Sequence, residues 1–165
     1  MGDKKFYAGI GSRETPESIK PTIERIVKRL NELGYTLRSG GADGADKFFE
    51  EYAIEKEIFL PWKNFNENKS ALNKQSTEAF EMAKKYHPVF NKLSVGAQKM
   101  MARNCYQVLG EDLESPVEFV ICWTKDGKSS GGTGQAIRIS EDTGIPVYNL
   151  NREGDTKKLI ERLWS

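Results

Sequence analysis

Apolar residues along the chain follow two alternating patterns. The first pattern is a short run of consecutive apolar residues, which is typical of a strand. Such runs predict strands over residues 5–10, 35–38, 57–60, 117–123 and 147–150. The fourth run, VEFVICW, is continuously apolar, as expected for a strand that is buried on both faces of a parallel sheet.

Between these runs, apolar residues recur at the spacing of an amphipathic helix. In the first such stretch, Thr15-Pro16 is typical of a helix start, Pro21 predicts a kink or a later start, and Gly34 ends the pattern. Further helices are predicted from the loop after the second strand to about residue 56, and over residues 76–86, 95–109, 133–142 and 155–164.

This alternation of strands and helices predicts an α/β sandwich of three layers, in which helices flank a mostly parallel sheet. We expect residues 1–165 to form one domain, with a helical insertion around residues 63–112. Sheets of this kind bind ligands at the carboxyl ends of their strands. The candidate functional residues are therefore those that directly follow a predicted strand.

Charge is balanced over the whole chain but not along it. The chain has 25 Lys and Arg against 24 Asp and Glu, so no overall field favours a nucleic acid or a membrane as partner. Residues 63–103 carry eight basic and three acidic side chains, a local net charge of +5. A solvated helical face explains this excess most simply, and a nucleic-acid surface is the alternative.

Cysteine usage and the N-terminus indicate the compartment. Cys105 and Cys122 lie far apart among apolar residues, which predicts buried, reduced thiols. The first ten residues contain no long apolar run, so neither a signal peptide nor a membrane span is predicted. We expect a cytoplasmic protein without a membrane partner, assembled as a homo-oligomer of two or more copies.

The loop SGGADGAD follows the second strand. Ser39, Gly40 and Gly41 let the backbone approach a ligand closely, and two carboxylates, Asp43 and Asp46, follow them. These carboxylates would repel a phosphate but accept hydrogen bonds from ribose hydroxyls. We expect this loop to hold the sugar of a nucleotide, with Asp43 as a simple helix cap being the alternative.

The loop SGGTGQ, residues 130–135, is better suited to a phosphate. It has three glycines, no acidic residue and a helix that begins within it, so bare N–H groups and the helix dipole attract an anion. A cation is expected from the segment after the first strand. The predicted phosphate site consists of Gly11, Ser12, Arg13, Gly131, Gly132, Thr133 and Gln135.

Two tryptophans, Trp62 and Trp123, also follow strands. Either one can stack on a base, a contact worth about 1–3 kcal/mol in single-stranded nucleic-acid sites, or belong to the core. The sequence lacks the residues of two common nucleotide-binding motifs. Glu14 stands at the third glycine of the dinucleotide-binding fingerprint, and there is no GxxxxGK[ST] phosphate loop. One histidine, His87, and two distant cysteines support neither a Ser-His-Asp triad nor a zinc site, so we expect no metal and no cofactor.

Taken together, the segments YAGIGSRETP, GYTLRSGGADGADKFFE, MMARN and SSGGTGQAIRISEDTGIPVYNL resemble the SLOG superfamily. This Rossmann-like group contains the DNA-processing protein DprA/Smf, the LOG cytokinin-activating phosphoribohydrolases and several nucleotide-sensing domains. The resemblance implies a Rossmann-like fold and covers nearly the whole chain, least well over residues 63–95. Small stand-alone members resemble phage and bacterial proteins that are described only as DprA-like or LOG-like, which suggests a phage or anti-defence setting.

The resemblance to the LOG enzymes is incomplete. Gly131, Gly132 and Gly134 match the glycines of their PGGxGTxxE loop, but Arg138 stands where the catalytic glutamate is expected. The LOG arginine is matched by Arg103, and Arg103-Asn104 also resembles the RN pair of DprA-like proteins. On helical periodicity alone, Arg103 faces solvent.

Three functions are compatible with these residues. The first is binding of a nucleotide or a nucleotide-derived molecule, as a sensor or a sequestering protein without LOG chemistry. The second is hydrolysis of the N-glycosidic bond of a nucleotide, with Asp43 or Asp46 in place of the lost glutamate and Arg103 as a further candidate. The third is DprA-like binding of single-stranded DNA through the basic residues between 63 and 103.

Overall fold

A parallel sheet of five strands forms the centre of the computed structural model, which describes residues 4 to 165. The strands are β1 (Lys5–Gly11), β2 (Tyr35–Ser39), β3 (Lys56–Ile58), β4 (Val120–Trp123) and β5 (Val147–Asn149). Their order across the sheet is β3-β2-β1-β4-β5, and every neighbouring pair is parallel. In the register of the central pair, Gly11 lies opposite Trp123.

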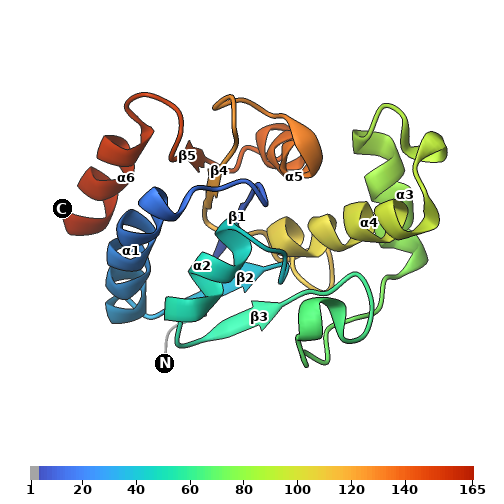
Figure 1. Cartoon of the computed structure of the whole chain (residues 1–165), viewed down its shortest axis with the longest axis horizontal. Helices are drawn as coiled ribbons and strands as arrows, with labels where there is room; N and C mark the ends of the chain where they lie inside the picture. The colour runs from blue at the N-terminus through green and yellow to red at the C-terminus, as the bar shows by residue number, and fades with distance from the viewer. Residues whose placement is uncertain (1–3) are drawn as a thin grey trace.

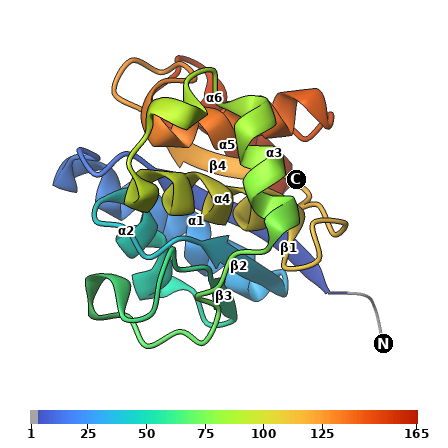
Figure 2. The same cartoon turned by 90° about the vertical axis from the view of Figure 1, so that its right-hand side faces the viewer.

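Helices cover both faces of this sheet (Figure 1). One face packs against α1 (Lys20–Glu32), α2 (Ala45–Tyr52) and α6 (Asp155–Trp164). The other face packs against α4 (Val95–Leu109) and α5 (Gly131–Asp142), and α3 (Thr77–Tyr86) lies outside these two helices (Figure 2). Among residues 4–165, no helix is both long and apolar enough to cross a membrane.

Alternation along the strands divides the interior into two hydrophobic cores. In β1, the side chain of Tyr7 enters the core beneath α1, α2 and α6, whereas Ala8 and Ile10 enter the core beneath α4 and α5. Because successive strand residues point to opposite faces, a central strand that is covered on both sides must be apolar throughout. The predicted three-layer α/β fold is therefore confirmed.

Element boundaries differ from the predictions where a local partner ends or delays an element. α1 begins at Lys20, after a short 3-10 turn over Glu17–Ile19, so the later start that Pro21 predicted is found and a start at Thr15-Pro16 is wrong. α2 ends at Tyr52 rather than near residue 56, because the chain turns there and the Ile54 N–H binds Asn31 Oδ1 at 3.2 Å.

The other boundary differences are smaller. β4 begins at Val120 rather than at residue 117, where the N–H of Val117 binds the carbonyl of Val108 at 2.9 Å. α5 begins at Gly131, two residues before the predicted start. The segment predicted as a helical insertion, residues 63–112, contains α3, α4 and two 3-10 turns, Phe65–Glu67 and Phe90–Lys92, and its helix α4 covers the sheet.

The order of the strands fixes where a ligand can enter. From β1 the chain moves to β2 and β3 on one side, then crosses to β4 and β5 on the other side. The loops that follow β1 and β4 consequently diverge. A crevice at the carboxyl ends of two such strands is the usual ligand site of an open parallel sheet.

Candidate functional site

A cavity of about 690 Å³ opens at the carboxyl ends of β1 and β4. Its walls come from the end of β1 and the loop after it (residues 10–14), the loop after β4 (124 and 125), the start of α5 (130–133) and the inner side of α4, with Phe65 at one edge. These segments are distant in sequence, and the sheet topology brings them together.

Nine of the sixteen predicted ligand residues line this cavity. They are Gly11, Ser12, Arg13, Asp46, Arg103, Asn104, Gly131, Gly132 and Thr133. Seven others do not line it: Ser39, Gly40, Gly41, Asp43, Trp62, Trp123 and Gln135.

The carboxylate of Asp46 holds two ligand-site loops together. It accepts a hydrogen bond from the N–H of Gly11, the last residue of β1, at 3.2 Å, and one from the Ala42 N–H at 3.3 Å, in the loop after β2. The residue is only 3% exposed. Burial raises the pKa of Asp46 to about 6, although the Arg103 charge and the backbone hydrogen bonds act in the opposite direction.

Arg103 is the buried cation beside this carboxylate. It is 5% exposed, so the solvent-facing position that periodicity predicted is wrong. Its guanidinium donates to the carbonyls of Gly40 and Phe59, the latter at 3.1 Å, and to Asn104 Oδ1 at 3.0 Å. Desolvation lowers the pKa of Arg103 to about 10, while the Asp46 charge raises it.

Gly40 lies where these polar groups meet. A Cβ atom added to Gly40 would be 2.8 Å from Arg103 Nη1, 2.8 Å from Asp46 Oδ2, and would collide with Gln107 Nε2. The glycine in this loop is therefore needed by the packing of the protein itself.

The start of α5 presents backbone N–H groups to the cavity. Ser130 is the N-cap residue, but no side chain caps the helix, because the Ser130 hydroxyl donates instead to Asp126 Oδ1 at 2.8 Å. A Cβ on Gly131 would meet no atom within 4 Å, and one on Gly132 would meet only Met101 Cε, at 3.2 Å. An anion can therefore approach these N–H groups closely.

Asn104 ties α4 to this helix start. Its amide donates to the carbonyl of Gly132 at 3.1 Å and to Gln135 Oε1 at 3.4 Å, while its Oδ1 accepts from Arg103. The pair Arg103-Asn104 thus connects the loop after β2 with the start of α5. Gln135, which was predicted as a ligand residue, supports this connection from a fully buried position.

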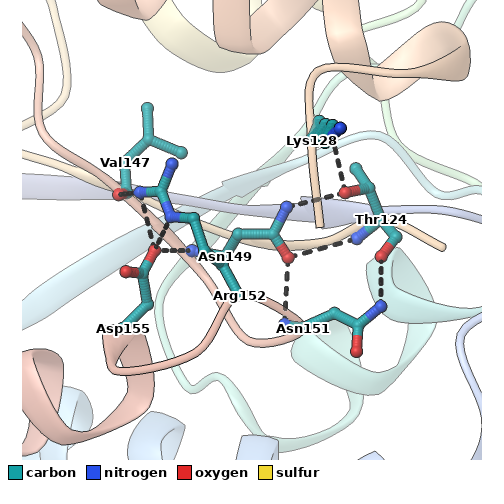
Figure 3. Close-up of polar contacts among 7 residues, drawn as sticks. All are labelled: Thr124, Lys128, Val147, Asn149, Asn151, Arg152 and Asp155. Atoms are coloured by element: carbon teal, nitrogen blue, oxygen red, sulfur yellow. Dashed lines mark hydrogen bonds and ion pairs between the residues drawn. The ribbon is translucent and has the colours of Figure 1, made fainter. Parts of the chain in front are cut away.

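A second network holds the loop after β4 (Figure 3). The Asn149 side chain donates to Thr124 Oγ1 at 2.7 Å and accepts from the backbone N–H groups of Thr124 and Asn151. The Asn151 side-chain amide donates to the carbonyls of Thr124 and Lys125, both at 2.9 Å. Asp155 anchors β5 by accepting the Asn149 N–H at 2.9 Å. Lys125 is therefore placed at the cavity by the loop after β5.

Three predicted residues have other surroundings. Gly44, not Asp43, is the N-cap residue of α2, so the interpretation of Asp43 as a cap is wrong, and its carboxylate pairs with exposed Lys47 at 3.0 Å. Trp123 is 8% exposed and belongs to the core. Trp62 is 37% exposed and packs edge-on against Phe65, whose ring reaches the cavity.

Known proteins resemble this chain in fold but not in sequence. No protein-family model matches the chain, and no curated protein matches it in sequence. DNA processing protein A from Helicobacter pylori superposes over 96% of this chain and 72% of its own, with a TM-score of 0.58 and 18% identity. DNA processing protein A from Streptococcus pneumoniae superposes over 96% of this chain with a TM-score of 0.53 and 15% identity.

The fold is DprA-like. The chain spans 56% of the length of the Streptococcus pneumoniae protein. The Helicobacter pylori protein is known for its mode of binding single-stranded DNA. At these identities the likeness concerns the fold, which agrees with the Rossmann-like architecture that the SLOG resemblance implied.

Several residues that line the cavity were not predicted from the sequence. Phe65 lies in the polar stretch between the third predicted strand and the helix predicted over residues 76–86. Gln107 and Met100 lie on α4 among residues that resemble ordinary core. Thr124 and Lys125 follow β4 directly, so the strand-end rule that identified Arg13 also applied to them. Residues 4–165 contain no cluster of three or more His, Cys, Asp or Glu side chains that could hold a metal ion.

Proposed function

We propose that this chain binds a nucleotide or a nucleotide-derived small molecule in the cavity, as a sensor or a sequestering protein. The observation that carries the proposal is the open start of α5, where Gly131 and Gly132 leave space in front of the first-turn N–H groups. Arg13 and Lys125 line the same cavity, so cations complement a phosphate at that position. Phe65, Met100 and Met101 provide apolar surface for a base.

The proposed function does not include LOG-type hydrolysis. Arg138, at the position of the LOG glutamate, donates to the carbonyl of Tyr86 at 3.0 Å and does not line the cavity. Asp46 is the buried carboxylate of the cavity, and its oxygens accept two backbone N–H groups that fix the loops. We therefore assign Asp46 to loop positioning and ligand binding.

A panel of nucleoside monophosphates and cyclic nucleotides tests binding by thermal unfolding. A ligand at one hundred times its dissociation constant stabilises the native state by about 2.7 kcal/mol. For a chain of this size the melting temperature should rise by about 5–10 °C. An assay for released base or sugar phosphate should detect no product, and turnover would instead favour the glycosidase alternative.

Gly132→Val tests whether the phosphate binds at the start of α5. The added side chain fills the space in front of the α5 N-terminus, so we expect nucleotide binding to be lost while the fold remains. Gly96→Val is the matched control, because Gly96 also lies in a helix, a Cβ added there would meet only Trp62 within 4 Å, and the residue does not line the cavity. Equal binding by wild type and Gly132→Val would refute the phosphate assignment.

Binding of single-stranded DNA is a second candidate, favoured by the fold shared with the Helicobacter pylori protein and by the +5 charge of residues 63–103. The two candidates differ in their dependence on salt. Polynucleotide binding weakens steeply as salt rises, because each contacted phosphate releases counterions, whereas a mononucleotide has few charges to neutralise. Titrations of a labelled oligo-dT and of the best mononucleotide at two salt concentrations separate them.

A further inference from the structure

The side-chain amide of Gln107 lines the cavity without a partner. Gln107 lies on α4 and is only 3% exposed, yet its amide forms no hydrogen bond with any residue from 4 to 165. Among these residues, only Tyr7 Oη is a side-chain polar atom both sealed from solvent and without a partner, so the Gln107 amide is reached through the cavity. A nearly buried polar group of this kind needs a hydrogen-bond partner from the cavity, which is water in the free protein and can be a ligand in the complex.

Gln107 belongs to a polar floor around Gly40. Its Nε2 lies against this glycine, and Asp46 Oδ2 and Arg103 Nη1 are each 2.8 Å from the position of a Cβ at the same residue. The floor therefore offers a charged acceptor, an amide that both donates and accepts, and a cation, all within a small region.

The three parts of the cavity match the three parts of a nucleotide. The start of α5 with Arg13 suits the phosphate, and the apolar wall that includes Phe65 suits the base. The floor does not suit a phosphate, because Asp46 would repel it. Hydroxyl groups suit it well, since they donate to a carboxylate and both donate to and accept from an amide.

We propose that Gln107 and Asp46 bind the ribose hydroxyls of the nucleotide and so select ribonucleotides over 2′-deoxyribonucleotides. This inference rests on the proposed function, because it assigns the sugar within the same cavity. The ribose is covalently next to the phosphate, which agrees with the way Arg103 and Asn104 connect the floor with the start of α5.

Calorimetric titration of the four ribonucleoside 5′-monophosphates and their 2′-deoxy counterparts tests this assignment. Wild type should bind the best ribonucleotide at least about tenfold more tightly than its deoxy form, since a hydrogen bond to a charged group is lost. In Gln107→Leu the ribonucleotide affinity should fall toward the deoxy value, while the deoxy affinity changes less than about threefold. The melting temperature without ligand should stay level or rise, because no protein hydrogen bond is removed.

Gln98→Leu is the matched control on the same helix. The Gln98 amide donates to the carbonyls of Phe90 and Leu93, both at 3.2 Å, and does not line the cavity. This variant should melt at a lower temperature with an unchanged ratio of ribonucleotide to deoxynucleotide affinity. If Gln107→Leu folds poorly, Gln107→Met provides the same loss of the amide with an unbranched side chain.

The outcomes separate the inference from the proposed function. If wild type binds ribo and deoxy forms equally, or if the ribose preference persists in both Gln107 variants, the inference is overturned and nucleotide binding stands. Loss of discrimination among bases, rather than between sugars, would assign Gln107 to the base and also overturn it. If neither these eight nucleotides nor the cyclic nucleotides of the first panel bind, the proposed function fails and the inference fails with it.

Discussion

At the scale of single residues, the cavity depends on Asp46. This carboxylate is almost completely buried, and it accepts backbone N–H groups from two loops that lie 35 and 4 residues from it in the sequence. Arg103 compensates part of the charge from a position that is also next to Gly40. Burial of a charge without such partners would be strongly unfavourable, which explains why Asp46 and Arg103 are found together.

Asp46 should make stability depend on pH in a characteristic direction. Burial raises its pKa from 3.8 to about 6, so the native state binds more protons than the unfolded state between these values. The free energy of unfolding contributed by Asp46 therefore falls as pH rises from about 4 to about 6, and is constant above that range. Urea unfolding of wild type and Asp46→Asn over this range measures the contribution, which the variant should lack.

At pH 7.5 the same Asp46→Asn variant should be less stable than wild type by about 1–3 kcal/mol. An asparagine has one acceptor oxygen, so one of the N–H groups of Gly11 and Ala42 faces an NH₂ group, and Arg103 loses its opposite charge. If the free energy of unfolding of the two proteins instead changes equally with pH between about 4 and about 6, the expectation of a raised pKa for Asp46 is wrong.

At the scale of elements, the cavity depends on hydrogen bonds between α4 and α5 and between the loops after β4 and β5. Asn151 donates to the carbonyl of Thr124 (Figure 3). It also donates to the carbonyl of Lys125, and thereby fixes the loop that leads to α5. Asn31 is a close counterpart elsewhere: its amide group binds the carbonyl of Tyr52 at 2.9 Å and the N–H of Ile54 at 3.2 Å.

Comparison of these two asparagines should separate stability from binding. Asn151→Ala and Asn31→Ala each remove two hydrogen bonds to a loop, so both should lower the free energy of unfolding by about 1–3 kcal/mol. Only Asn151→Ala should also weaken nucleotide binding, because it frees the loop that carries Lys125. Urea unfolding together with calorimetry measures both effects. A comparable loss of affinity in Asn31→Ala would show that the change in binding follows from general destabilisation.

The helices and strands were predicted from the sequence better than the residues of the cavity. Apolar periodicity over α4 predicted its bounds, 95–109, because a helix pattern is local. The interpretation of Arg103 as exposed failed because periodicity describes one apolar stripe, whereas the opposite side of α4 packs against segments 44 and 63 residues away. Gln107 carried no signal at all, since its position depends on the packing of Gly40 against α4.

At the scale of the whole molecule, charge is segregated rather than excessive. The net charge is +1, while residues 63–103 carry +5, and one of these basic residues is the buried Arg103 of the cavity. This segment includes α3 and most of α4 (Figure 2). Lys63 follows the exposed Trp62, and Lys99 lies one turn beyond Gly96 of α4, where an added Cβ would lie 3.6 Å from the Trp62 ring. Neither lysine lines the cavity, so this basic surface and the proposed nucleotide site can be altered separately.

The double variant Lys63→Gln, Lys99→Gln therefore distinguishes the two candidate functions. If the cavity alone binds the physiological ligand, the affinity for a mononucleotide should change less than about twofold, because exposed charges at a distance are screened at physiological salt. A polynucleotide bound along the basic surface would lose two phosphate contacts, and the slope of log affinity against log salt would become shallower by about 1.4. Anisotropy titrations of labelled oligo-dT at 50 and 200 mM salt, alongside calorimetry with the mononucleotide, measure both quantities.

We expect weak oligo-dT binding by wild type and an unchanged mononucleotide affinity in the variant. Tight oligo-dT binding with a steep slope that the variant reduces would instead establish the basic surface as the functional one.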